Sequence, residues 1–232
     1  MTTAPSTVHT DSTPSGSVWR GYLPGAAGLA YVAAWVAGLA AWPVNLALTA
    51  TAGQAAASYR AHPAEAIVQY ALVEGLAGAL LGIVLASALR AARDDAGRWA
   101  AGPAALSAIA VVTSLSQCVI GLCATAAATG GHVAACGSLS DLVNRLDGAK
   151  MLALAAAAAW LALTGLALPR WLRGVTAALT VALIASGYAY LTLSNGLAWT
   201  AYASGPLLLL WVAGVGIALS RRYRRRSGPG TS

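Results

Sequence analysis

Charged side chains are scarce in this sequence of 232 residues: Asp, Glu, Lys and Arg make up only 9% of it, against roughly 25% in an ordinary soluble domain. Hydrophobic residues make up 58%. This composition excludes an ordinary water-soluble domain, because a soluble core could not bury so much apolar chain. The apolar residues fall in blocks near the length that crosses about 30 Å of hydrocarbon. The sequence therefore predicts an integral membrane protein.

The motifs of common catalytic and cofactor sites are also missing. There is no Gly-rich phosphate loop, no Ser-His-Asp set and no helical His-Glu-x-x-His motif. His9, His62 and His132 all fall outside the predicted spans, which argues against haem between them. His132 and Cys136 alone are a weak metal signal. We therefore expect a protein that has no enzymatic activity, no cofactor and no metal.

The apolar blocks predict an all-α fold with six transmembrane helices in a compact bundle. Residues 1–18, rich in Ser, Thr and Pro, predict a disordered tail, and residues 221–232 predict a basic tail. The segment 44–65 is too polar to span but fits a surface helix that Pro63 breaks. The expected spans are 24–42, 67–89, 103–129, 149–168, 175–193 and 199–220.

The connection between spans three and four, Gly130 to Gly148, is the longest polar segment in the second half of the chain. Ser138 and Asp141 have a capping-box-like spacing, and Gly148 would end a short helix in this loop. A membrane enzyme is an alternative if polar groups converge here, although an ordinary amphipathic loop helix explains them equally well. These groups are His132, Asp141, Arg145, Asp147 and Lys150.

Basic residues are distributed unequally. The tails and the even-numbered connections hold eleven Lys and Arg residues, and the odd-numbered connections hold three. Because basic residues accumulate on the cytoplasmic side of short segments, both termini are predicted to be cytoplasmic. The arginines after the last span predict contact with anionic lipid headgroups, at about 1 kcal/mol each, and not nucleic-acid binding. They are Arg221, Arg222, Arg224, Arg225 and Arg226.

Glu74 is the only acidic residue well inside a predicted span. A charge at such a depth costs at least about 2.5 kcal/mol, so the side chain should face the protein interior. It could be a proton or cation site, or a protonated group that makes one interhelical hydrogen bond; we weigh the second reading more heavily. Gly78 and Gly82 form a GxxxG pair near the same face, which predicts a helix-packing surface.

Span three carries a polar stripe. Ser114 and Gln117 are three residues apart, so they share a helix face. They would serve as hydrogen bonds between helices or, together with Glu74 and Asn195, as the lining of a solute path. Among the cysteines, a disulfide between Cys123 and Cys136 is left open, and the absence of a Cys-x-x-Cys pair argues against a thiol oxidoreductase.

Two segments carry a resemblance to a known family. The junction Pro169, Arg170, Trp171, Leu172 and the second span, with Glu74 and a closing Arg90, resemble the DUF4386 family of uncharacterised bacterial six-span membrane proteins. The resemblance covers about residues 28–219 and implies the fold and a bacterial plasma membrane, but no activity. This chain lacks the acidic residues that the family pattern has in spans three and six.

The sequence thus leaves two functions from different classes. The first is a non-enzymatic accessory or interaction protein, favoured by the scarcity of polar groups inside the spans. The alternative is a small proton-coupled transporter or permease that uses Glu74 in the bundle interior. A water-accessible cavity that reaches Glu74 would favour the transporter, whereas a Glu74 sealed among Ala and Gly would exclude it.

Overall fold

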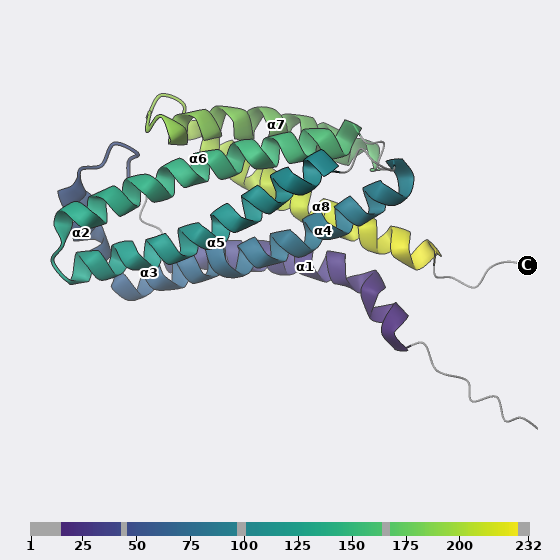
Figure 1. Ribbon diagram of the computed structural model, residues 1–232, viewed down its shortest axis with the longest axis horizontal. Helices are drawn as coiled ribbons and strands as arrows, with labels where there is room; N and C mark the ends of the chain where they lie inside the picture. The colour runs from purple at the N-terminus through teal and green to yellow at the C-terminus, as the bar shows by residue number, and fades with distance from the viewer. Residues whose placement is uncertain (1–14, 43–45, 97–100, 164–167, 227–232) are drawn as a thin grey trace, which may run out of the picture.

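The computed structural model describes residues 15–42, 46–96, 101–163 and 168–226, and within these ranges all regular secondary structure is helical (Figure 1). Within the same ranges six segments are long and apolar enough to cross a membrane, which confirms the predicted all-α, six-span fold. The chain is therefore a multi-pass membrane protein. Residues 1–14 of the predicted N-terminal tail and 227–232 of the predicted C-terminal tail lie outside the described residues. The six segments are Gly21–Ala41, Pro63–Asp94, Gly102–Thr129, Val133–Leu163, Arg170–Leu191 and Ala198–Arg226.

Long apolar runs rich in Ala and Leu form continuous helices here, because in lipid each backbone N–H and C=O group must be bonded within its own segment. The helices are α1 (Ser15–Ala41), α2 (Ala52–Ala61), α3 (Pro63–Gln69), the π-helix η1 (Tyr70–Leu76), α4 (Ala77–Ala96), α5 (Ala101–Thr129), α6 (Val133–Leu163), α7 (Arg170–Leu191), the 3₁₀-helix η3 (Ala198–Thr200) and α8 (Ala201–Arg226).

The long helices form a closed ring. Each packs on the next along the chain, from α4 through α8, and α1 packs on both α4 and α8. Figure 1 shows the end of α8 and the start of α1 at the same end of the bundle. There the Gly25 amide donates to Ser220 Oγ at 2.9 Å, and the Arg224 guanidinium lies 5.2 Å from the centre of the Tyr22 ring. These contacts join the first span to the last.

Small residues allow the close approach of α1 and α8. A Cβ on Gly28 would lie 2.9 Å from the carbonyl oxygen of Val212, and one on Gly216 would collide with the carbonyl of Pro24. Such backbone contacts are typical of membrane helix pairs, which gain stability from packing since lipid provides no hydrophobic drive between helices. The core beside them contains large buried side chains such as Trp211 and Leu219.

The prediction of a long loop between spans three and four is wrong. Only residues 130–132 separate α5 from α6, and Gly131 makes the turn with φ +82°. Gly148 does not end a helix: a Cβ there would lie 2.7 Å from the carbonyl oxygen of Gly187, so it is a packing residue where α6 meets α7. The polar residues 133–148 are therefore part of the spanning helix itself.

The helices also extend further into the predicted tails. α1 begins at Ser15, so residues 15–18 are helical, and α8 continues to Arg226, so the five arginines lie on a helix. Once a span is helical, each added residue needs no new nucleus. Basic side chains also interact favourably with the C-terminal end of a helix dipole.

The predicted helix between spans one and two is present as α2. The Thr51 hydroxyl oxygen caps its start by accepting a hydrogen bond from the backbone N–H of Gln54. In return, the side-chain Oε1 of Gln54 accepts a hydrogen bond from the backbone N–H of Thr51. Pro63 occupies the first turn of α3, where its missing N–H costs nothing. α2 does not lie freely on the surface, because Ala56 and Tyr59 are buried against α5 and α6.

The second span contains a feature that the sequence did not indicate. Its helix, Pro63–Ala96, changes to π-geometry over Tyr70–Leu76 and returns to α-geometry at Ala77. The π-turn packs on α5, with the Tyr70 ring against Gly121 and Gly75 facing Cys118. Short π-segments inside α-helices are frequent at functional sites. Glu74 lies within this one.

Candidate functional site

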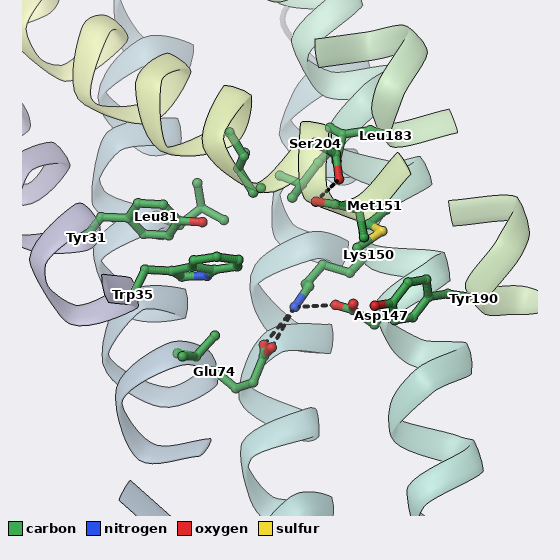
Figure 2. A pocket seen from close by; sticks show the side chains of 15 residues that line it. Tyr31, Trp35, Glu74, Leu81, Asp147, Lys150, Met151, Leu183, Tyr190 and Ser204 are labelled. Atoms are coloured by element: carbon green, nitrogen blue, oxygen red, sulfur yellow. Dashed lines mark hydrogen bonds and ion pairs between the residues drawn. The ribbon is translucent and has the colours of Figure 1, made fainter. Parts of the chain in front are cut away.

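Glu74 is held by two other helices. It is only 9% exposed, and both of its carboxylate oxygens contact Lys150 Nζ of α6, at 3.0 Å and 2.8 Å (Figure 2). Ser114 of α5 donates to Glu74 Oε2 at 2.7 Å and lies 3.2 Å from the Glu74 carbonyl oxygen. The carboxylate therefore contacts an ammonium group and a hydroxyl on two other helices, whereas the sequence favoured a single interhelical hydrogen bond.

Lys150 has a second carboxylate partner. Asp147 lies one turn earlier on α6, and its Oδ1 is 2.8 Å from Lys150 Nζ. Lys150 is 13% exposed and Asp147 is 20% exposed, both in a helix of membrane-spanning length. If all three groups are ionised, the cluster carries one net negative charge. Uncompensated charge in a poorly solvated interior is costly.

A cavity of about 130 Å³ lies beside the cluster. Figure 2 shows Trp35 and Tyr31 of α1 across the cavity from Asp147 and Tyr190, with Lys150 between them. Such a volume accommodates a few water molecules or one small polar solute. The lining combines three ionisable groups and several hydroxyls with apolar walls, as is usual for small-ligand sites. The apolar wall comprises Trp35, Val73, Leu81, Met151, Leu154, Leu183, Ala201, Gly205 and Leu208.

Tyr190 separates this cavity from a second, more polar one of about 150 Å³ near the α2 end of the bundle. The second cavity is lined by Asp141 and Asn144 of α6 and by the Tyr59 and Tyr70 hydroxyls, which are 2.6 Å apart. Burial raises the pKa of Tyr59, although its hydrogen bond to Tyr70 acts in the opposite direction. The Tyr59 phenol therefore stays a neutral hydrogen-bonding group at physiological pH.

The structure brings together only part of the predicted polar site. Ser114 contacts Glu74, whereas the Gln117 amide donates to the Val143 carbonyl of α6 at 3.1 Å. Asn195 lies outside the cluster, donating to Thr49 Oγ1 at 2.8 Å. It lines a groove of about 600 Å³ that shares Trp35 and Tyr190 with the Glu74 cavity.

Gly78 and Gly82 lie against α5. A Cβ on Gly78 would be 2.8 Å from Ser114 Oγ, and one on Gly82 would be 3.4 Å from Val111. Gly78 thus lets α4 approach the same serine that binds Glu74. Its small size contributes to the position of this hydrogen bond.

The cysteines are free in this structure, so the Cys123–Cys136 bond left open by the sequence is absent from it. Cys123 is exposed on α5, whereas Cys136 is buried on α6 next to α2. Because α6 begins at Val133, Cys136 is fixed in a helix and not in a loop that could fold back.

Sequence reasoning named Asp147 and Lys150 only as polar groups of the connection after span three, and it missed Tyr31 and Tyr190 as site residues. Asp147 was placed in the loop because the following Gly148 resembled a helix stop, and Lys150, at the start of the expected span 149–168, was counted with that loop. One available signal was their i,i+3 spacing, which places opposite charges on one helix face, followed directly by the apolar run 151–163. Tyr31 and Tyr190 carried no comparable signal, because their proximity to the cluster depends on the packing of α1 and α7.

Within the described ranges, no three His, Cys, Asp or Glu side chains are grouped as a metal site requires. No family model matches the chain, and no curated protein or solved structure is significantly similar to it. Any inference about function must therefore rest on geometry. The geometry identifies a multi-pass helical membrane protein with an acidic-basic-acidic cluster and an adjoining cavity inside its bundle.

Proposed function

We propose that this protein is a small carrier that moves protons by binding them at the cluster of Glu74, Lys150 and Asp147, and that the adjoining cavity also admits a small polar solute. The observation that carries the proposal is the cavity beside an ion cluster with excess negative charge inside the spans. An ion pair serving only stability would need neither a second carboxylate nor adjoining space. Ionisable groups within spans are rare, and they commonly mark ion or proton pathways.

The arrangement allows the charges to exchange partners. Lys150 binds Glu74 and Asp147 at similar distances, so a proton or a cationic group of a solute could neutralise one carboxylate while the other keeps Lys150 paired. Ser114 and the hydroxyls of Tyr31, Tyr190 and Ser204 provide further hydrogen-bonding groups around the cluster. No catalytic residue is required, and we propose that the protein acts without enzymatic turnover.

Replacing Glu74 by Gln should abolish proton movement. In proteoliposomes containing a pH-sensitive dye, with a potential imposed by potassium and valinomycin, we expect the wild type to acidify the lumen several-fold faster than empty vesicles do. The variant E74Q should match empty vesicles, because Asp147 still neutralises Lys150 but no charge is left over to bind a proton. E65Q is the matched control, since Glu65 is a half-exposed residue of the same helical segment.

Infrared spectroscopy separates binding from transport. Between neutral and acidic buffer, a carboxylic-acid band should appear reversibly, should be reduced in E74Q or D147N and should persist in E65Q. Its exchange in deuterated buffer should be complete within seconds, because the cavity supplies water. A cluster that never binds a proton, in vesicles that stay impermeable, would support the accessory or interaction role and overturn the carrier.

We also propose that the protein lies in a bacterial plasma membrane, as the resemblance to the DUF4386 family suggests, and that both termini face the cytoplasm. The distribution of basic residues supports this orientation, and the support grows once Lys150 is counted as part of the bundle and not of an odd-numbered connection. A C-terminal green fluorescent protein fusion should fluoresce, and a C-terminal alkaline phosphatase fusion should be inactive. The reverse result would invert the orientation.

A further inference from the structure

A groove of about 710 Å³ runs between α7 and α8, at the opposite end of the bundle from α2. Its walls change in character along its length. Pro169 and Trp171, at the start of α7, lie opposite a stripe along α8 that begins apolar and ends basic. The stripe comprises Leu210, Ala213, Gly214, Ile217, Ala218, Arg221, Arg222, Arg225 and Arg226.

The apolar part has the dimensions of a lipid chain. From Leu210 to Ala218 an α-helix rises about 12 Å, which fits within one leaflet, half of a hydrocarbon layer of about 30 Å. The arginines begin within the next turn, where headgroup phosphates lie. Leu210 is 48% exposed and Trp171 is 53% exposed, so this wall is open to the surroundings of the bundle.

Trp171 shapes the groove. A Cβ on Gly214 would lie 2.8 Å from Cη2 of the Trp171 indole, so the ring lies directly on the α8 backbone. This contact places the ring against the middle of the apolar stripe, where it forms one wall of the groove.

Two of the arginines at the end of α8 contact residues of other helices. Arg224 lies over the Tyr22 ring of α1, away from the groove, and Arg226 contacts Asp94 Oδ2 at 3.2 Å. Arg221 and Arg225 are four residues apart and so share one helix face, which is the face that lines the groove. Two guanidinium groups on one face are suited to a phosphate, because each can donate two parallel hydrogen bonds.

We propose that this groove binds one anionic phospholipid, with its phosphate at Arg221 and Arg225 and an acyl chain along the stripe from Leu210 to Ala218. This is a defined binding site, in addition to the general attraction of basic residues to an anionic membrane surface. The site is independent of the Glu74 cluster, since the two cavities share no lining residue.

Native mass spectrometry of the full chain, released from detergent in the presence of phosphatidylglycerol or phosphatidylcholine, tests the proposal. The wild type should retain one phosphatidylglycerol and bind it more tightly than phosphatidylcholine. R221Q/R225Q should lower the phosphatidylglycerol affinity by about tenfold. The control R173Q/R224Q removes the same charge from the same end of the bundle, outside the groove, and should retain the lipid.

Equal losses in the two double variants would mean a diffuse charge effect and would overturn the proposal. So would displacement of the lipid by millimolar glycerol 3-phosphate, because the basic end would then bind a free phosphate without need of the chain. If R221Q/R225Q does not fold, L210W provides a second test: it fills the exposed apolar end and should displace the lipid without changing charge.

Discussion

Lys150→Met should reduce the free energy of unfolding by about 3 kcal/mol or more, the usual cost of removing one partner from a buried ion pair. Lys150 is the only cation in direct contact with both Glu74 and Asp147 among the described residues, and each carboxylate has an oxygen within 2.8 Å of its Nζ. Without the ammonium group, two nearby carboxylates would repel each other in a poorly solvated interior. The melting temperature of the purified protein in detergent, measured by intrinsic fluorescence, should fall by several degrees.

Neutralising all three groups of the same cluster should restore the stability that the single variant loses. The triple variant E74Q/D147N/K150M removes all three charges while keeping similar volumes, and neutral replacements of buried ion networks are often tolerated. It should therefore recover most of the lost stability while remaining inactive in proton transport. R145M is the control on the same helix, because Arg145 is exposed and its guanidinium donates to the Leu191 carbonyl, away from the two carboxylates. A single variant as stable as the wild type, or a triple variant no better than the single one, would contradict this account.

Gly148→Ala should destabilise the protein by about 1–3 kcal/mol, the typical cost of overpacking a well-packed interface. The added Cβ would lie 2.7 Å from both the Gly187 carbonyl oxygen and the Leu191 amide nitrogen. Both are backbone atoms that cannot rotate away, so α6 and α7 would have to separate. Because Asp147 and Lys150 flank this contact, the variant should also weaken proton transport. Thermal unfolding and the vesicle assay measure the two effects.

Gly174→Ala is the matched control on α7. No atom lies within 4 Å of a Cβ placed at this position, and Ala is favoured over Gly in a helix interior by roughly 0.8–1 kcal/mol. The same chemical change should therefore have opposite signs at the two positions. If both variants melted at the same temperature, the close contact between α6 and α7 would not be a determinant of stability.

The buried position of Glu74 could be predicted from the sequence. Its position in an apolar run required that it face the interior, and the structure places it there. The same reasoning located Ser114, which contacts it, and Gly78, which packs on that serine. It could not find the partner of Glu74, since Lys150 is 76 residues away and stood at the very start of an expected span, where it was counted with the preceding loop.

Gly148 shows why that assignment failed. A glycine in a polar segment resembles a helix stop, but it equally permits two helices to touch, and only the position of α7 distinguishes the two roles. The π-turn around Glu74 could not be predicted from the sequence for a similar reason. Its Tyr70 packs against Gly121, which belongs to another helix.

The sequence by itself determined the lipid environment of this protein, its helical fold class and the number of its spans. Lipid requires every backbone group to be bonded locally, so composition and the length of apolar runs are sufficient to predict helices. Only the tertiary structure decided which polar groups meet. Each charge in the bundle needs a compensating partner, and whether Lys150 reaches Glu74 depends on the close packing of helices that are distant in sequence.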